Sequence, residues 1–344
     1  MNSPVKTTAK RVVTFGELLL SLCVKGHERL VQAEEFRARY TGAEANVGVS
    51  LATFGFEAYA VSRVPENEIG QACINYLRRY GVNTNHVVRG GERLGLLYLE
   101  TGASQRPSKV VYDRSHSSMR KARREEFDWD TILAGKQWFH FSGTAPALGE
   151  SVLAVLTDGL RSAQRLGVKV SCDANYRSKL WSVEDAGRVL AGIMEHVDVL
   201  ICGREDAGKL FNIDPAPHSS AGQSVDQRAA QLLRERFELE YVAMTSRGGT
   251  SASVNRLAGL LCDKAGCYVS REYEMQIVDR VGGGDAFTAG LIYGLLSGHD
   301  PQRVVEFACA ASCLKHSIPG DFNLVTVPEV EQLLSGNESG RVQR

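Results

Sequence analysis

Features that would place this chain in a membrane or on nucleic acid are missing from its sequence. The opening stretch, MNSPVKTTAK, contains no apolar core of signal-peptide length, and the apolar segment Leu18–Val24 is far too short to cross a bilayer. Neither sign of charge is in excess, because 40 Lys and Arg balance 40 Asp and Glu, and this balance argues against nucleic acid as the main partner. We therefore expect a cytoplasmic enzyme with no membrane or nucleic-acid partner.

The sequence also lacks a C-x-x-C pair, although it contains eight cysteines. Four of them, Cys23, Cys73, Cys172 and Cys202, are scattered singly. Cys309, Cys313 and His316 share one face of an expected helix, but the surrounding Ala, Leu and Phe favour small buried residues over metal ligands. The cysteines therefore indicate neither a disulfide framework nor a zinc site.

What is present is a regular alternation of strand and helix patterns. Short apolar runs predict strands at 11–16, 58–64, 138–142, 168–175, 197–202 and 241–245. Apolar residues at helical spacing predict helices at 42–54, 68–80, 151–167, 184–196, 226–237, 302–316 and 329–334. This alternation predicts an α/β fold with right-handed βαβ units and a parallel sheet covered on both faces. Residues 336–344 are typical of a disordered tail.

The stretch Ile277–Leu296 carries the strongest chemical signal. Gly282, Gly283 and Gly284 precede Asp285 and an apolar segment that we expect to be a buried helix. The first N–H groups of a helix lack partners and lie at the positive end of its dipole, so they can hold a phosphate. Asp285 could then take a proton from a hydroxyl group that attacks the phosphate. Asp is also a favoured N-cap residue, but capping does not need three consecutive glycines.

Two motifs give this chain a family resemblance. Asp279-x-Val-Gly-Gly-Gly-Asp285-Ala-Phe287 resembles the C-terminal signature of the ribokinase/phosphofructokinase-B (PfkB) family of carbohydrate kinases, and the segment 40–55 supplies Gly42 and Asn46 in the expected order. The resemblance extends over residues 11–335. It implies Asp285 as the catalytic base, the preceding glycines as the anion hole, and ATP and Mg²⁺ as cofactors.

The same resemblance implies an architecture. We expect one ribokinase-like domain over 11–335, a three-layer sandwich with a doubly wound, mainly parallel sheet and helices on both faces. A small β-sheet lid, formed by about 18–41 and 94–115, is expected to cover the sugar. The family also suggests a homo-oligomer that assembles through the lid.

Polar residues at alternate positions point to an acidic substrate. In Asp173-Ala-Asn175-Tyr-Arg177 they would project to one side of an extended strand end, toward the ligand edge of the sheet. Arg binds carboxylates through paired hydrogen bonds and stays charged, which suits a sugar acid better than a neutral sugar. The alternative is that Arg177 merely pairs with Asp173.

The expected lid contributes further polar groups. Tyr112 and Arg114 obey the same rule of alternate positions, and Tyr98 is available from the neighbouring strand. The alternative is a surface pair between Arg114 and Asp113. With Gly42 and Asn46, these residues resemble the 2-keto-3-deoxygluconate kinase branch of the family, in which the tyrosines and both arginines hold the sugar acid while its terminal hydroxyl group is phosphorylated.

The nucleotide side gives weaker signals. The segment 203–210 nearly matches a Walker phosphate loop, but Leu210 has no hydroxyl group for Mg²⁺. Relatives usually carry N-x-x-E here, and without the Asn either Glu205 or Asp206 could organise Mg²⁺ through water. Asp279 could help coordinate a monovalent cation such as K⁺.

The resemblance also implies an ATP-binding stretch in Thr245-Ser-Arg247-Gly248, beside the phosphates and ribose, with a surface turn as the alternative for this stretch. It further suggests that Asn323 approaches the adenine. The favoured interpretation is therefore an ATP-dependent sugar-acid kinase. Three alternatives stay open: a kinase of a neutral sugar such as fructose or ribose, an inactive sugar- or protein-binding relative, and a dinucleotide-dependent oxidoreductase. The oxidoreductase is disfavoured because the first strand is not followed by G-x-G-x-x-G.

Overall fold

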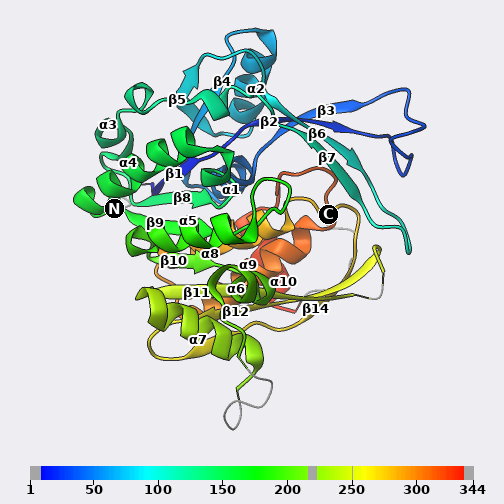
Figure 1. Cartoon of the computed structure of the whole chain (residues 1–344). Coiled ribbons are helices and arrows are strands. Elements are labelled where there is room, and N and C mark those ends of the chain that lie inside the picture. The colour runs from blue at the N-terminus through cyan, green and yellow to red at the C-terminus, as the bar shows by residue number, and fades with distance from the viewer. Residues whose placement is uncertain (1–8, 216–222, 250, 337–344) are drawn as a thin grey trace, which may run out of the picture.

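The computed structural model describes residues 9–215, 223–249 and 251–336 and is built on one large sheet (Figure 1). The strand order is β13-β12-β11-β10-β9-β8-β1-β4-β5, with β14 paired to β12. All neighbours from β11 to β5 are parallel, whereas β12 runs antiparallel to β11, β13 and β14. The strands are β1 (Arg11–Phe15), β4 (Glu57–Val64), β5 (Asn83–Arg89), β8 (Trp138–Ser142), β9 (Lys169–Asp173), β10 (Val199–Ile201), β11 (Tyr241–Gly249), β12 (Val254–Cys262), β13 (Cys267–Val269) and β14 (Tyr273–Gln276).

The strand order reverses at β1, since the chain runs outward through β4 and β5 on one side and through β8 to β11 on the other. In an open α/β sheet, ligands bind outside the carboxyl ends of the strands next to such a reversal. The doubly wound, mainly parallel sheet predicted from the sequence is thus confirmed, and its topology places a binding site beside β1 and β8.

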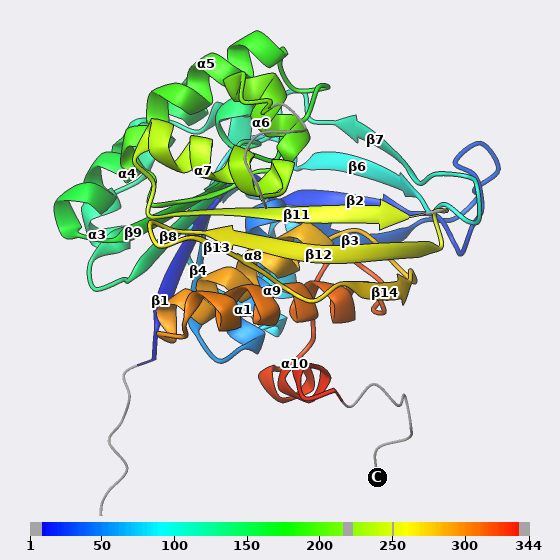
Figure 2. The same ribbon diagram turned by 90° about the horizontal axis from the view of Figure 1, so that it is seen from below.

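Helices cover both faces of the sheet (Figure 2). One face carries α3 (Trp129–Leu133), α4 (Glu150–Leu166), α5 (Val183–Ile193), α6 (Arg204–Phe211) and α7 (Val225–Phe237). The other carries α1 (Ala43–Thr53), α2 (Glu68–Arg79), α8 (Gly283–Leu296), α9 (Pro301–Lys315) and α10 (Val327–Leu334). Separate buried clusters lie under the two layers, which confirms the three-layer arrangement. None of the helices in these described residues is long and apolar enough to cross a membrane.

A second, four-stranded sheet projects from the body and forms the expected lid (Figure 1). Its order is β3-β2-β6-β7, and its strands are β2 (Leu19–Cys23), β3 (Arg37–Thr41), β6 (Gly95–Glu100) and β7 (Lys109–Asp113). Its inner face packs through one small buried cluster, made of Leu19, Cys23, Leu97 and Leu99. We call this the lid sheet.

Several local features differ from the sequence predictions. The segment that resembles a phosphate loop is helical from its second residue onward, as α6, and neither β5 nor α3 was predicted from the sequence. Cys262 and Cys267 form a disulfide, against the expectation drawn from scattered cysteines. They lie directly opposite each other on antiparallel β12 and β13, so the turn between the strands brings them together. The predicted disordered tail falls, apart from residue 336, outside the described residues.

Candidate active site

A cavity of about 530 Å³ lies at the carboxyl ends of the central strands, under the lid sheet. Its walls combine residues from the ends of β9, β10 and β11, from the starts of α1 and α8, and from the lid strands β2, β6 and β7. Thirteen of the residues proposed from the sequence line it: Gly42, Asn46, Tyr112, Arg114, Asp173, Asn175, Arg177, Asp206, Thr245, Arg247, Gly282, Gly284 and Asp285. The site therefore gathers segments that are far apart in the chain.

The glycine turn before α8 is held by close backbone packing. Gly282 is the N-cap of α8 with φ of 80°, and a Cβ there would overlap the carbonyl oxygen of Asp321. A Cβ on Gly283 would overlap the imidazole of His316. Gly282 and Gly283 thus let the turn sit against the segment that follows α9.

Gly284 lines the cavity, as Gly282 does. The atom nearest to a Cβ placed on Gly284 is Nη2 of Arg247, at 3.5 Å. The N–H groups of Gly284 and Asp285 belong to the first turn of α8, where a helix offers them no carbonyl partner. A guanidinium group and the positive end of a helix dipole therefore meet beside Asp285, as an anion site requires.

Asp285 is oriented from the start of α1. Asn46 Nδ2 donates a hydrogen bond of 2.6 Å to Asp285 Oδ2, and Thr41 Oγ1 donates to Asn46 Oδ1 over 3.1 Å. Burial raises the pKa of Asp285 to about 6, although the Asn46 bond and the charge of Arg177 favour the ionised form. A carboxyl group with this pKa is ionised near neutrality and is still basic enough to accept a proton during a reaction.

A second carboxyl group, Asp173, ends β9 at the same cavity. Burial and the charge of Asp285 together raise its pKa to about 7, against the opposing charge of Arg177. Its Oδ1 accepts a hydrogen bond of 3.1 Å from the N–H of Asn175. Two carboxyl groups that share one desolvated site resist being ionised together.

The alternation proposed for 173–177 does not continue as a strand. β9 stops at Asp173, and Asn175 adopts a left-handed conformation with φ of 38°. Asp173, Asn175 and Arg177 nevertheless all line the cavity, so a turn brings them together where an extended strand was expected.

On the lid sheet, Tyr112 and Arg114 line the cavity, and the guanidinium carbon of Arg114 lies 4.6 Å from the centre of the Tyr112 ring. Arg114 Nη1 is 3.5 Å from Oε2 of the buried Glu17, whereas Asp113 pairs with Arg93. The alternative pair between Arg114 and Asp113 is therefore wrong.

Tyr98 requires a correction. The residue of β6 directly opposite Tyr112 is Leu97, and Leu97 lines the cavity. Since successive side chains of a strand point to opposite faces, Tyr98 lies on the outer face, where its ring contacts Phe36 with centroids 6.0 Å apart.

Of the residues that the sequence assigns to nucleotide or metal binding, some line the cavity and others do not. Asp206 lines the cavity, and burial raises its pKa, whereas Glu205 is exposed and pairs with Lys209. Thr245 and Arg247 line the cavity.

Three other proposed residues are not among those that line it. Gly248 pairs with Arg256 along β11 and β12. Asn323 is buried, and its Oδ1 accepts from the N–H of Val325. The carboxylate of Asp279 accepts from backbone N–H groups beneath the glycine turn.

Sequence reasoning missed Glu44, which is buried beside the site. Its Oε1 accepts hydrogen bonds from the N–H and hydroxyl groups of Ser142, at 3.0 and 2.5 Å. Burial raises the pKa of Glu44 to about 7, and the charge of Asp285 adds to this effect. An acidic residue on the otherwise apolar first turn of α1 was the available signal.

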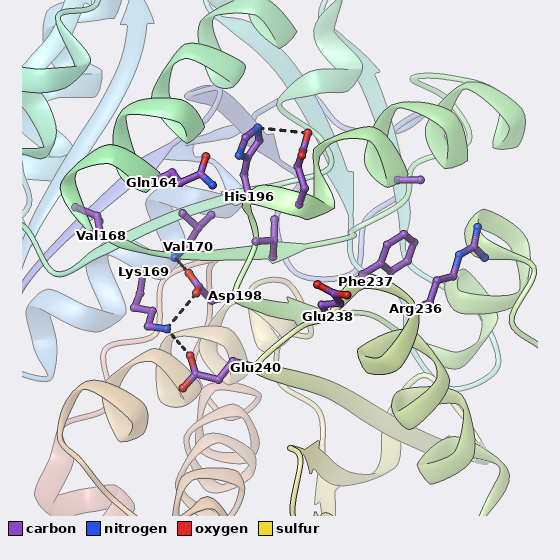
Figure 3. A pocket seen from close by; sticks show the side chains of 14 residues that line it. Gln164, Val168, Lys169, Val170, His196, Asp198, Arg236, Phe237, Glu238 and Glu240 are labelled. Carbon is purple, nitrogen blue, oxygen red and sulfur yellow. Dashed lines mark hydrogen bonds and ion pairs between the residues drawn. The ribbon is translucent and has the colours of Figure 1, made fainter.

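A second cavity, of about 690 Å³, lies at the amino ends of the same parallel strands (Figure 3). Lys169 there pairs with Asp198 and Glu240, at 3.1 and 2.5 Å. None of the residues proposed from the sequence lines it, and ligand sites in such sheets lie at the carboxyl ends of strands. The cavity at Asp285 is therefore the candidate active site.

Comparison with known proteins agrees with this geometry. The sequence pattern of the pfkB family carbohydrate kinases matches residues 9–323. The 2-dehydro-3-deoxygalactonokinase of Haloferax volcanii is 31% identical over 329 residues, which are 96% of this chain and 98% of that protein. The crystal structure of 2-dehydro-3-deoxygluconokinase from Thermotoga maritima has a TM-score of 0.92 and 46% identity, covering 96% of this chain and 99% of its own.

A more distant structure, a putative ribokinase II of E. coli in complex with ATP and Mg²⁺, has a TM-score of 0.80 at 19% identity and covers 95% of this chain and 99% of its own. At that identity the likeness concerns the fold. The family pattern covers most of the chain and includes both the Asn46 and the Asp285 segments. This chain therefore belongs to the pfkB family of carbohydrate kinases.

Proposed function

We propose that this protein transfers the terminal phosphoryl group of ATP to the terminal hydroxyl group of a sugar acid, with 2-dehydro-3-deoxygluconate as the preferred substrate. The observation that carries the proposal is that Arg114 and Arg177, from separate elements, line the same cavity as Asp285. Two guanidinium groups suit a carboxylate, which accepts paired hydrogen bonds from each. The names of the relatives from H. volcanii and T. maritima, both kinases of keto-deoxy sugar acids, support the same choice.

In this mechanism Asp285 accepts the proton of the attacking hydroxyl group, while Asn46 holds the carboxylate in place. The N–H groups of Gly284 and Asp285 and the guanidinium group of Arg247 stabilise the charge on the transferred phosphoryl group. ATP binds as the second substrate along Thr245 and Arg247. Family membership removes the oxidoreductase alternative.

Asp206 is the residue we propose to hold Mg²⁺, through water. Carboxylate oxygens are ligands that Mg²⁺ prefers, and the metal keeps several of its waters. Asp206 lines the cavity, while the charge of Glu205 is already paired. When bound, Mg²⁺ neutralises phosphate charge.

Coupled measurement of ADP production against a panel of sugars tests the proposal. The panel contains 2-dehydro-3-deoxygluconate, its galactonate epimer, gluconate, fructose and ribose. We expect kcat/KM for the keto-deoxy acids to exceed that for fructose and ribose by at least ~10²-fold, because a site built for a polar group rejects analogues that lack it. A preference for fructose or ribose would establish a neutral-sugar kinase instead. If no sugar of the panel supports ADP production, the remaining alternative is an inactive sugar- or protein-binding relative.

The outer face of the lid sheet supports a proposal on assembly. Phe36 and Val111 are 41% and 48% exposed there, beside Tyr98. Exposed apolar side chains on one face of a sheet are typical of an interface, and we propose a second copy of this chain as its occupant. Val111→Glu should then lower the molar mass measured by light scattering, and a mass unchanged from the wild type would contradict this.

We further propose that residues 11–335 form one domain that works in the cytoplasm.

A further inference from the structure

Lys315, the last residue of α9, is completely buried, with 0% of its side chain exposed. Lysine is almost never fully buried unless its charge is compensated. Its Nζ donates to two backbone carbonyl oxygens, that of Asp279 at 3.3 Å and that of Ile318 at 3.2 Å. Within the described residues no salt bridge to Lys315 is formed, so carbonyl oxygens are the ligands of this ammonium group.

Those carbonyls belong to the two segments that build the glycine turn. Asp279 begins the approach to Gly282, and Ile318 begins the loop whose Asp321 carbonyl packs against Gly282. Lys315 Cε lies 3.3 Å from the position of a Cβ on Gly282. The Lys315 side chain therefore fills the space directly behind the anion hole.

Asp279 links the same two segments with its side chain. Its Oδ1 accepts from the N–H of Val281 at 3.1 Å, and its Oδ2 accepts from the N–H of Gly320 at 2.8 Å. The side chains of Asp279 and Lys315 thus both connect the glycine turn to the loop that follows α9 by hydrogen bonds.

Charged groups surround the Lys315 side chain and oppose the effect of its burial, although its pKa is still lowered. Burial lowers its pKa, while the negative charges of Asp279, Asp321 and Asp285 raise it, and the positive charge of Arg39 adds a smaller lowering effect. An ammonium group near three carboxylates and held by carbonyl oxygens is in the environment that a small monovalent cation would prefer.

We propose that the Lys315 ammonium group is a built-in cation that holds the glycine turn in its phosphate-binding shape and takes the place of the K⁺ that the sequence suggested at Asp279. Lys315 is a positioning residue, because it acts on the phosphoryl group only through the turn. The inference rests on the proposed kinase activity, and it implies that this activity needs no added monovalent cation.

The first experiment measures kcat and KM of the wild type with Mg²⁺ in K⁺, Na⁺ or tetramethylammonium salts at constant ionic strength. We expect all values to agree within about twofold, since a cation that has no site to bind shifts nothing. Strong activation by K⁺ would overturn the proposal. Thermal unfolding in the same salts gives a readout that does not depend on activity: we expect no K⁺-specific shift, and such a shift would reveal a separate cation site and overturn the proposal even if no sugar is turned over.

The second experiment removes the ammonium group. In Lys315→Ala, kcat should fall by ~10²-fold with little change in KM for the sugar, because the turn loses its alignment. Added K⁺, NH₄⁺ or methylammonium should restore part of the loss by entering the vacated space. The exposed Lys264, on the turn between β12 and β13, supplies the control: Lys264→Ala should keep its activity and show no cation response.

A purely structural role predicts a different pattern. If Lys315 only completed the end of α9, Lys315→Ala would unfold at a lower temperature but keep its kcat and show no rescue by cations, and this result would overturn the proposal. Should Lys315→Ala fail to fold, Lys315→Met keeps the side-chain volume and removes the charge, so the loss of kcat can still be measured. Wild-type kcat in Lys315→Met would also overturn it.

Discussion

The glycine turn and the lid sheet face each other across one cavity, yet they are held in different ways. Behind the turn, Ser312 Oγ donates to the carbonyl of Gly283 over 2.7 Å, and α8 continues as a helix in which 9 of 14 residues are buried. In the part of the chain that the structure describes, the lid sheet has one small buried cluster of its own, Leu19, Cys23, Leu97 and Leu99, and its Leu20 and Tyr40 pack at the edge of a neighbouring core cluster. A base and an anion hole need fixed geometry, whereas a surface that closes on a sugar must be able to move, and regions with few buried contacts are the ones that open most easily.

The largest expected effect tests the fixed side of this comparison. Asp285→Asn should lower kcat by at least ~10²-fold, the low end for loss of a general base, because the amide cannot accept the proton of the substrate hydroxyl group. Steady-state kinetics on the folded variant measures this, with Glu184→Gln, an exposed carboxylate on α5, as the control that should keep full turnover. Turnover close to that of the wild type in Asp285→Asn would remove Asp285 as the base.

A smaller effect is expected where the sugar acid is recognised. Arg177→Ala should raise KM for 2-dehydro-3-deoxygluconate by ~10-fold or more and change KM for fructose much less, because a charge-assisted hydrogen bond is lost only with the acid. Arg177 is preferable to Arg114, whose removal would leave the buried Glu17 without its ion-pair partner. Arg188→Ala, an exposed arginine on α5, is the matched control. Equal increases in KM for both sugars would argue against carboxylate binding.

The pH profile separates the two regions again. Since the pKa of Asp285 is about 6, kcat/KM should fall about tenfold per pH unit below that value, as protonation removes the base. The arginines that bind the carboxylate stay charged throughout this pH range, so they do not contribute to the fall of kcat/KM at low pH. A profile of kcat/KM that stays flat from about pH 5 to about pH 8 would contradict a base with a pKa of about 6.

The fixed region could be predicted from sequence because its parts are local motifs. Asp285 with its glycines and Asn46 at the start of α1 are each recognisable within a few residues, and the fold then joins them across 239 positions by a direct hydrogen bond. The order of strands and helices follows equally well, because each element has its own apolar period.

The side-chain positions that the sequence did not predict are set by contacts between segments that are distant in the chain. Tyr98 was placed in the cavity because the register of β6 against β7 was unknown, and an error of one residue turns a side chain to the other face. Asn323, in the segment between α9 and α10, is buried and accepts a hydrogen bond from the N–H of Val325, and it is not among the residues that line the cavity. Lys315 carries no local sign of its role, since a lysine at the end of a helix usually points to solvent.

The smallest expected effect is the influence of the buried Asp285 carboxyl group on the thermal stability of the protein. The pKa of Asp285 is raised from 3.8 to about 6 in the folded protein, so the folded state binds this proton more tightly than the unfolded chain does. Stability is therefore lost as pH rises from about 4 to about 6, and the loss is complete above that range. Asp285→Asn removes the charge, and differential scanning calorimetry should show a Tm higher than that of the wild type by ~1–3 °C at pH 8. The difference should vanish near pH 4, where the wild-type carboxyl group is protonated. Glu184→Gln should show no such difference between the two pH values. A lower Tm for Asp285→Asn than for the wild type at pH 8 would mean that the ionised carboxylate stabilises the folded protein.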